Sequence, residues 1–274
     1  MKSHLETLVG SALQLLAVRA TAVPLKEIEK QARAQPPPRD FVKALRSARD
    51  RGAALIAEIK RASPSRGSLA PDLEPAHIAA AYAAGGAACL SVLTDRTHFS
   101  GSLEDLVAAR AACALPVLRK DFLVTPYQIF EARAHGADAV LLIAAALTKG
   151  RLQELRTLAA SLRLAVLVEV HDEAELEAAQ ACKPDLLGVN ARDLKTLAVD
   201  PDTFARLAPK ARGLAPLVAE SGVRTPDDVR RLCALGASAL LVGEALSTAA
   251  DPAAATRALV SAIPPAARLV GEAE

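Results

Sequence analysis

Cysteine is scarce in this chain, and its placement excludes the usual metal and disulfide patterns. Cys89, Cys113, Cys182 and Cys233 are scattered, with no CxxC pair and no spacing typical of metal ligands. Such cysteines are predicted to be small core residues in a reducing compartment. Histidine forms no metal pattern either, because no two histidines stand four residues apart, and we expect ordinary surface or core positions for them.

Long apolar runs and a charge excess are also missing. No stretch of about 20 uncharged apolar residues occurs, so no membrane-spanning helix is predicted. Charged residues precede the first apolar run and no cleavage-site pattern follows, which argues against a signal peptide. With 33 basic and 31 acidic residues, the net charge of +2 gives no reason to expect nucleic acid or a membrane as a partner. We therefore expect a cytoplasmic protein.

The chain is long and apolar enough for one large domain or two small ones, with 274 residues of which 51% are hydrophobic. Residues 1–50 are predicted to form a helical extension, with helices at Leu5–Val18, Pro24–Ala34 and Arg39–Arg49 and a stiff proline linker before the third. The apolar patch Gln14–Val18 would pack either on the main domain or on another subunit. The predicted oligomeric state is a monomer or a weak homodimer.

Residues 51–274 alternate between short apolar runs and helical stretches. The predicted strands are Ala54–Lys60, Ala88–Leu93, Pro116–Arg119, Ala139–Ile143, Ala165–Val170, Leu186–Val189, Pro216–Ala219 and Ala239–Val242. The predicted helices are Pro75–Ala84, Leu103–Ala112, Pro126–His135, Gly150–Leu162, Glu173–Gln180, Pro201–Leu207, Pro226–Leu235 and Pro252–Ala262. Several helices begin with proline and end in a glycine before the next strand.

These eight strand–helix units predict a (β/α)8 barrel that makes one structural domain with the extension. Continuous apolar strands indicate burial on both faces, as in a parallel sheet, and eight such units most economically close into a barrel. A doubly wound open sheet is the alternative fold. Against it, no G-x-G-x-x-G follows the first strand.

In such a barrel the active site lies at the carboxyl ends of the strands, where ionisable side chains interrupt the apolar pattern. Glu58 and Lys60 are separated by one residue, so in a strand they share one face while Ile59 points away. The later strands end in Lys120, Glu169, Asn190, Glu220 and Ser221. Lysines and carboxylates that converge there shift one another's pKa values, as general acid–base catalysis requires.

A phosphate site is predicted where the last two strands end. Gly222 and Gly243 follow these strands, and the corresponding loops commonly cradle phosphate in barrels. Arg192 would supply a bidentate partner, and Glu244 would contribute only its backbone because its side chain repels phosphate. The loop Ser63–Gly67 adds hydroxyls and positive charge, including Ser63.

An apolar floor for an aromatic ring is predicted from Pro64 and Phe122, with plain packing as the equally weighted alternative. No side-chain pattern points to a metal or an organic cofactor. A small phosphorylated molecule is the expected substrate.

Four segments together resemble the indole-3-glycerol phosphate synthase family. The resemblance runs from about Val23 to Val260 and is carried by Ala57–Ser65, Lys120–Ile129, Val189–Leu194 and Ala219–Gly222 in their order and spacing. It implies a carboxy-lyase of tryptophan biosynthesis that closes the pyrrole ring of 1-(2-carboxyphenylamino)-1-deoxyribulose 5-phosphate with loss of carbon dioxide and water. The chain has no tryptophan, and relatives often cover the substrate with an N-terminal aromatic residue.

The resemblance also implies residue roles. Lys120 would be the general acid on the ketone oxygen, Glu169 the base or acid of the dehydration, and Lys60, positioned by Glu58, the partner of the substrate carboxylate. The remaining family positions are Asn190, Glu220 and Ser221 in the catalytic constellation, and Arg192, Gly222, Gly243 and Glu244 at the phosphate.

Two other functions are weighed against this one. The neighbouring isomerase of the pathway works with a cysteine–aspartate pair, and the first strand here ends in Glu58 and Lys60 with no cysteine. A non-catalytic barrel would gain nothing from so many ionisable groups in its mouth.

Overall fold

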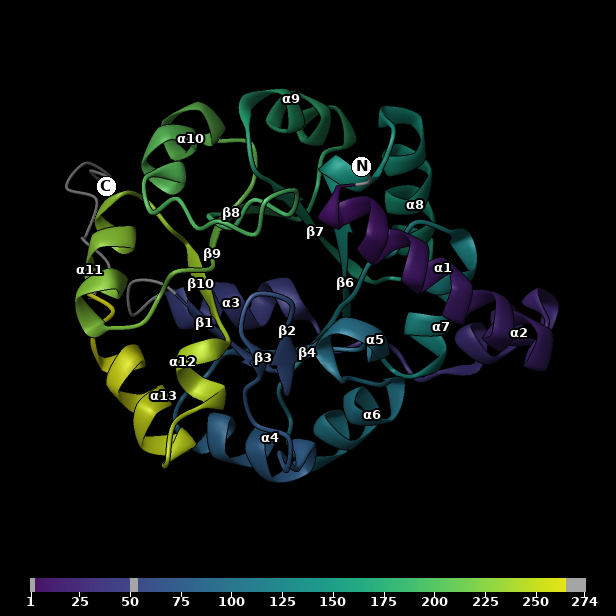
Figure 1. Cartoon of the computed structure of the whole chain (residues 1–274), viewed down its shortest axis with the longest axis horizontal. Coiled ribbons are helices and arrows are strands. Elements are labelled where there is room, and N and C mark those ends of the chain that lie inside the picture. Colours follow the sequence, from purple (N-terminus) through teal and green to yellow (C-terminus); the bar gives the residue numbers. More distant parts are fainter. Residues whose placement is uncertain (1–2, 50–53, 265–274) are drawn as a thin grey trace, which may run out of the picture.

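Eight parallel strands close into a barrel with helices outside, as Figure 1 shows. The structure is a computed structural model, and it describes residues 3–49 and 54–264. Each strand pairs with the next barrel strand along the chain, and β1 pairs with both β4 and β10 to close the ring. The barrel strands are β1 (Ala54–Ile59), β4 (Cys89–Leu93), β5 (Val117–Lys120), β6 (Ala139–Ile143), β7 (Ala165–Val170), β8 (Leu186–Asn190), β9 (Leu217–Glu220) and β10 (Ala239–Val242). The predicted barrel is confirmed.

Helices follow the strands around the outside. They are α4 (Pro75–Ala84), α5 (Arg96–Phe99), α6 (Leu103–Ala112), α7 (Pro126–Ala134), the 3-10 helix η1 (Ala144–Ala146), α8 (Lys149–Ser161), α9 (Glu173–Cys182), α10 (Thr203–Ala211), α11 (Pro226–Ala234), α12 (Glu244–Ser247) and α13 (Pro252–Ser261). A small hairpin, β2 (Ala62–Ser63) with β3 (Gly67–Ser68), rises from the loop after β1.

The strands are buried on both faces because alternate residues fill two apolar layers. Ile56, Leu118 and Leu167 belong to the layer inside the ring, whereas Leu55 and Ile59 belong to the layer between strands and helices. This period of two follows from the pleat of a strand. It explains why the strands read as continuous apolar runs with no polar face.

The turns from helix to strand use glycine in the left-handed conformation, as predicted. Gly86, Gly136 and Gly236 have φ values of 93°, 85° and 101°, and each donates its backbone N–H to a carbonyl of the last helical turn. A side chain would be strained at these φ values. The repeated turn therefore returns the chain to the barrel three times by the same local chemistry.

The predicted helix Pro201–Leu207 is placed wrongly. Helix α10 begins at Thr203 and runs to Ala211, with Pro209 inside it. The Asp200 side chain accepts hydrogen bonds from the Asp202 backbone N–H and the Thr203 hydroxyl, so a turn occupies the predicted first helical residues. Burial of Ala208 and Ala211 in the outer apolar layer carries the helix past its proline.

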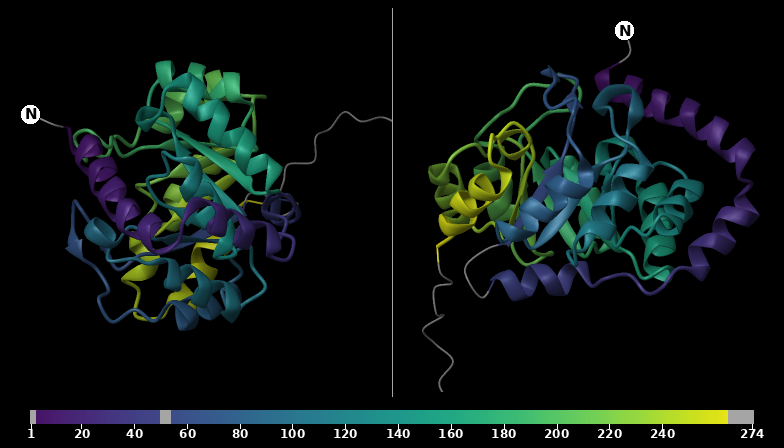
Figure 2. Two further views of the ribbon diagram at one scale, coloured as in Figure 1. Left: turned by 90° about the vertical axis from the view of Figure 1, so that its right-hand side faces the viewer. Right: turned by 90° about the horizontal axis from the view of Figure 1, so that it is seen from below.

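The extension wraps the barrel from mouth to base through α1 (His4–Ala22), α2 (Leu25–Ala34) and α3 (Phe41–Arg49). Figure 2 shows α1 and α3 at opposite ends of the barrel, and α2 packs beside α7. The apolar patch is divided: Leu16 is buried against the barrel, whereas Val18 is 71% exposed. The predicted boundary between extension and barrel, at residues 50 and 51, lies outside the described residues.

Within the described ranges, no single helix has both the length and the apolar character needed to cross a membrane. Only α1 and α2 taken together, bent by 86°, reach that length and composition. Both helices bury residues against the barrel, among them Leu8 and Ile28.

Candidate active site

One cavity opens at the carboxyl ends of the strands, and every residue predicted for the site lines it. These residues are Glu58, Lys60, Ser63, Pro64, Lys120, Phe122, Glu169, Asn190, Arg192, Glu220, Ser221, Gly222, Gly243 and Glu244. They come from six strands or from the loops that follow those strands. Barrel closure therefore brings to one place side chains that are up to 186 positions apart, from Glu58 to Glu244.

Glu58 and Lys60 form an ion pair at the end of β1. Oε1 of Glu58 lies 2.9 Å from Nζ of Lys60, and Ile59 between them points into the outer apolar layer. Gly243 closes over the pair: a Cβ at this position would lie 2.3 Å from Oε1 of Glu58 and 2.8 Å from Nζ of Lys60. Glycine is therefore required at position 243 to leave room for the pair.

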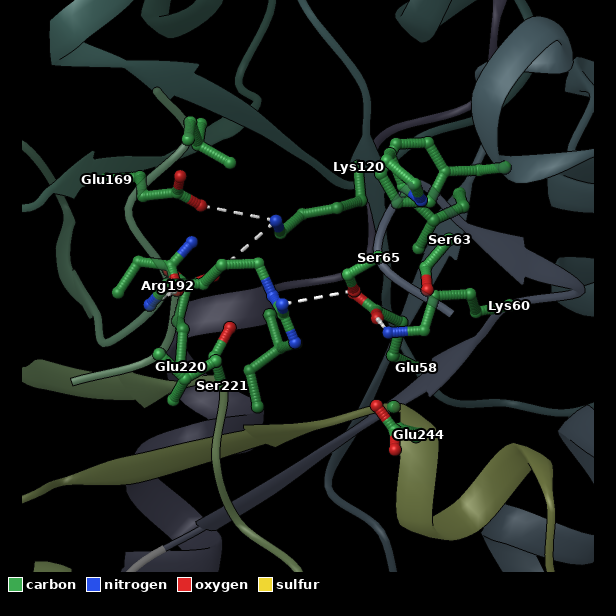
Figure 3. Close-up of a pocket in the computed structure, with 18 of the residues that line it drawn as sticks. Glu58, Lys60, Ser63, Ser65, Lys120, Glu169, Arg192, Glu220, Ser221 and Glu244 are labelled. Carbon is green, nitrogen blue, oxygen red and sulfur yellow. Dashed lines mark hydrogen bonds and ion pairs between the residues drawn. The ribbon is translucent and has the colours of Figure 1, made fainter. Parts of the chain in front are cut away.

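Lys120, Glu169 and Glu220, which we call the acid–base cluster, meet at the centre of the cavity (Figure 3). Nζ of Lys120 donates a hydrogen bond of 3.2 Å to Oε2 of Glu169 and lies 3.6 Å from Oε2 of Glu220. Both carboxylate side chains are almost fully buried. A Cβ on Gly188 of β8 would lie 2.0 Å from Oε1 of Glu220, so this glycine provides the space for Glu220.

Two buried carboxylates share one cation in this cluster, and their pKa values move apart. Burial by itself raises the pKa of Glu169, but the Lys120 ammonium and the His171 ring outweigh it and hold that pKa well below its usual range. Burial and the neighbouring Glu169 raise the pKa of Glu220 to about 8. Burial disfavours the Lys120 ammonium, yet the surrounding carboxylates raise the pKa of Lys120 well above its usual range. Near neutral pH, Glu169 is ionised and Glu220 holds a proton.

His171 lies directly behind Glu169, and the sequence interpretation did not place it at the site. Its Nε2 is 3.3 Å from Oε1 of Glu169, and its Nδ1 is 2.8 Å from Oε2 of Glu175. A signal was present in the sequence: Glu169 and His171 have the same one-residue separation as Glu58 and Lys60. His171 was instead expected at an ordinary surface or core position, because the histidines lie far apart in the sequence with no pair four residues apart.

The loops on the other side of the cavity form what we call the loop rim, made of Ser65, Arg66, Arg192, Arg224 and Glu244 together with Ser221, Gly222 and Gly243. Nη1 of Arg192 donates to the Ser65 hydroxyl at 3.1 Å and to the Leu197 carbonyl at 2.9 Å. Arg66, at the tip of the small hairpin, is paired with Glu244 at 2.7 Å. Ser221 and Gly222 both have positive φ, 64° and 78°.

Arg66 and Arg224 were not named as site residues from the sequence, although the positive charge of the hairpin loop was noted. Arg224 lines the cavity, and Arg66 reaches over it through Glu244. Their position depends on the course of two loops, which local sequence patterns do not give. The rim therefore holds more positive charge than expected.

Apolar side chains cover a further part of the cavity. Phe122 is buried and packs against Phe99, with ring centroids 6.3 Å apart, and Leu8 of α1 also lines the cavity. Pro64 contributes from the exposed hairpin loop. Leu8 of α1 and Phe99 of α5 were not predicted, because both reach the mouth through tertiary contacts.

Among the residues that the structure describes, no group of three or more histidine, cysteine, aspartate or glutamate side chains is placed to hold a metal ion. The two lysines of the cavity are instead paired with carboxylates, Lys60 with Glu58 and Lys120 with Glu169.

Comparison with known proteins gives a consistent result. Residues 5–259 match the profile of a family described as indole-3-glycerol phosphate synthase. An indole-3-glycerol phosphate synthase of Mycolicibacterium vanbaalenii is 50% identical over 258 residues, which cover 94% of each chain. One from Azospirillum brasilense is 51% identical over 248 residues, 90% of this chain and 95% of that protein.

Two solved structures share the barrel fold with this chain at low sequence identity. A 3-hexulose-6-phosphate synthase from Salmonella typhimurium superposes with a TM-score of 0.61 at 16% identity, covering 77% of this chain and 98% of that one. A thiamine phosphate pyrophosphorylase from Pyrococcus furiosus has a TM-score of 0.58 at 18% identity, covering 78% and 96%.

Proposed function

The chain belongs to the indole-3-glycerol phosphate synthase family, and from that premise we propose how its barrel mouth carries out the reaction. The enzyme closes the pyrrole ring of 1-(2-carboxyphenylamino)-1-deoxyribulose 5-phosphate, releases carbon dioxide and then water, and so forms indole-3-glycerol phosphate for tryptophan biosynthesis.

The substrate lies across the cavity with its aromatic ring and its phosphate at different walls. The ring packs on Phe122 and Pro64, which supply an apolar surface. The ring carboxylate pairs with Lys60, whose ammonium Glu58 holds at 2.9 Å. The phosphate lies at the loop rim, bound by Arg192 and by backbone N–H groups near Gly222 and Gly243, with Ser63 as a further hydroxyl donor.

Ring closure needs an acid at the ketone oxygen, because negative charge develops there as the aromatic carbon attacks. Lys120 fills this role. Its ammonium stands at the centre of the cavity, and the carboxylates of Glu169 and Glu220 keep it protonated. Loss of carbon dioxide then restores the aromatic ring.

Dehydration needs a proton for the leaving hydroxyl and a base for the proton on the adjacent carbon. Glu169 serves as the base or acid of this step, and it reaches the cavity beside Lys120. Asn190 and Ser221 line the same wall, and Glu220, protonated near neutral pH, completes the constellation. The Asn190 side-chain oxygen also accepts a hydrogen bond of 2.9 Å from the Arg192 backbone N–H, and this contact directs the segment after β8 toward the loop rim.

The isomerase alternative fits this cavity less well. Cysteine is not among the residues lining the cavity in the described part of the chain, and a cysteine–aspartate pair is what that chemistry uses. A barrel that only binds a ligand would not place two buried carboxylates of different pKa around one lysine, because the burial of unpaired charge is costly.

The observation that carries the assignment of roles is that Lys60, Lys120 and Glu169 face one cavity. The test follows the ultraviolet absorbance of indole formation from the anilino-deoxyribulose phosphate, with the isomerase substrate assayed in parallel. We expect product from the first substrate only, and Glu169→Gln should lower kcat at least a hundredfold. Full activity of Glu169→Gln would refute its role, and turnover of the second substrate alone would refute the function.

We also propose a cytoplasmic protein that acts as a monomer or weak homodimer, uses no metal or organic cofactor, and has no nucleic-acid or membrane partner. The near balance of charge and the four free cysteines support this proposal. Size-exclusion chromatography with light scattering and activity measured after treatment with a chelator would test it.

A further inference from the structure

A second cavity lies behind Glu169, on the far side of His171. Its lining includes His171, Glu175 and Asn190, together with Leu5 of α1. Asn190 lines both cavities, so only a single layer of side chains separates this space from the active site. The reaction steps assigned above use neither His171 nor Glu175.

The three side chains form a continuous line from the active site to the second cavity. Nε2 of His171 lies 3.3 Å from Oε1 of Glu169, and neither of these buried atoms has a well-aligned hydrogen-bond partner in the described part of the chain. On the other side, Oε2 of Glu175 accepts hydrogen bonds from both the Nδ1 and the backbone N–H of His171, each at 2.8 Å. The side chains are 11%, 1% and 12% exposed for His171, Glu169 and Glu175, so little solvent screens these contacts.

This geometry requires a proton between His171 and Glu169. Glu175 fixes the proton of Nδ1, because a carboxylate can only accept. Nε2 then faces Oε1, and two lone pairs 3.3 Å apart repel unless one atom carries a proton. That proton sits either on Nε2, giving an imidazolium beside a carboxylate, or on Oε1, giving a neutral ring beside an acid.

The proposed reaction consumes one proton in each turnover. The substrate enters with an ionised carboxylate, which leaves as neutral carbon dioxide. The ketone oxygen takes up two protons before it departs as water, and the adjacent carbon releases one. The balance is therefore one proton taken from solvent in each turnover.

We propose that His171, held by Glu175, positions Glu169 and stores the proton that Glu169 delivers during dehydration. This proposal rests on the proposed function. In the step, which follows the transfer of the Lys120 proton to the ketone oxygen, the Nε2–H bond of the imidazolium breaks and an O–H bond forms on Oε1 of Glu169. Glu169 then protonates the leaving hydroxyl, and the proton released by the adjacent carbon returns to the neutral amine of Lys120. The neutral ring, still donating from Nδ1 to Glu175, regains a proton from solvent in the second cavity.

Other charges face this line and set its proton affinity. Burial by itself lowers the pKa of His171, but Glu169 and Glu175 raise it to about 10, so the ring is charged at rest. Lys120 faces Glu169 from β5. The remaining charged groups of the second cavity are Asp172, Asp193, Lys195, Asp200 and Arg206.

A purely structural role is the alternative, since Glu175 lies in the first turn of α9 and its carboxylate caps the His171 N–H. The variants are chosen to separate the two. Glu175→Gln keeps a cap acceptor and removes the charge. His171→Gln keeps a polar group near Glu169 but cannot carry a proton, and His171→Ala leaves a space that opens toward the second cavity.

The experiment measures kcat and KM of the full-length enzyme for ring closure between pH 5.5 and 9.5, with thermal unfolding as a check on folding. We expect His171→Gln to lower kcat roughly 10- to 100-fold with KM within about twofold. Added imidazole should raise the activity of His171→Ala at least about tenfold. Glu175→Gln should shift the alkaline limb of kcat by about one unit to lower pH, because the cationic ring loses a negative neighbour.

His135→Gln is the matched control, because His135 is also half-buried and its Nδ1 is hydrogen-bonded to the Glu131 carbonyl, at the end of α7 away from the mouth. Its kcat should be unchanged. The proposal is overturned if kcat of His171→Gln stays within twofold of the wild-type value. It is also overturned if kcat falls, but imidazole does not rescue His171→Ala and Glu175→Gln does not shift the alkaline limb of the pH profile. Should the His171 variants not fold, the presence or absence of that shift decides. A wild-type enzyme that forms no indole product would refute the function instead.

Discussion

The two sides of the barrel mouth treat charge in opposite ways. In the acid–base cluster the side chains of Lys120 and Glu169 are 15% and 1% exposed, and both oxygens of Glu220 lack a hydrogen-bond partner among the described residues. In the loop rim, Arg66 and Glu244 are 58% and 24% exposed and satisfy each other. The cluster shifts pKa values strongly, whereas the exposed pair is screened by solvent.

This contrast separates chemistry from binding. Buried groups with too few partners are costly to maintain, and the cost is acceptable where it prepares an acid and a base for proton transfer. Exposed, mutually paired groups cost little and can exchange their partners for a phosphate. Substitutions in the cluster should therefore change kcat, and substitutions in the rim should change KM.

The largest effect is expected from Lys120→Met, which removes the general acid and leaves two buried carboxylates without their cation. We expect kcat to fall about a thousandfold, and stability to fall by roughly 3–5 kcal/mol as for a broken buried pair. Steady-state kinetics and urea unfolding measure both. Lys149→Met, which breaks an exposed pair with Glu177, should change neither quantity. If Lys120→Met kept half of the wild-type kcat, the contrast between the acid–base cluster and the loop rim would not hold.

Arg192→Ala tests the binding side. A charge-assisted contact to phosphate is lost, so KM should rise about tenfold or more while kcat changes less than threefold. Arg230→Ala, at an exposed position on α11, provides the control and should leave both constants unchanged. A loss confined to kcat would place Arg192 with the chemistry instead.

The cluster also predicts a pH-dependent effect on stability. The pKa of Glu220 is raised in the folded enzyme to about 8 from its usual value of 4.5, so its contribution to stability is complete below about pH 4.5 and is lost as pH rises to about 8. Glu220→Gln cannot ionise. Its free energy of unfolding should match that of the wild type at pH 4.5 and exceed it by a few kcal/mol at pH 8.5.

Urea titrations at the two pH values give this difference directly. Glu177→Gln, an exposed substitution on α9, should show no such gain. An equal difference at both pH values would mean that Glu220 is not protonated in the folded state.

The smallest effect is expected from Arg66→Ala. Removing this exposed arginine leaves the Glu244 carboxylate free to repel the phosphate, so KM should rise about two- to fivefold, and less at high salt. Adding Glu244→Gln to Arg66→Ala should return KM toward the wild-type value. If the double variant is no better than Arg66→Ala alone, Glu244 does not act on the phosphate.

The sequence pattern predicted those parts of the site that depend on local geometry. Glu58 and Lys60 share a face because strand side chains alternate, and their 2.9 Å contact needs no information from elsewhere in the chain. The glycine turns before the strands follow in the same way from the left-handed conformation at Gly136 and Gly236. The start of α10 was missed because the Asp200 side chain forms a turn that competes with the helix.

Contacts between distant segments could not be predicted residue by residue. Nothing local indicates that Lys120 lies between Glu169 and Glu220, because that distance depends on the closure of the ring. His171 was assigned an ordinary position although both of its partners are near in the sequence, because its contact with the active site depends on how the barrel buries Glu169. The division of the N-terminal apolar patch into a buried Leu16 and an exposed Val18 likewise depended on how α1 crosses the mouth.

By itself, the order of apolar runs, turn residues and strand-end charges determined a barrel, its catalytic end and the family of the chain, because each of these depends on neighbours within a few positions. The tertiary structure decided which charges share a proton and which merely pair at the surface. That distinction depends on burial and on distances of 3 to 4 Å between different strands, and only the folded ring fixes them.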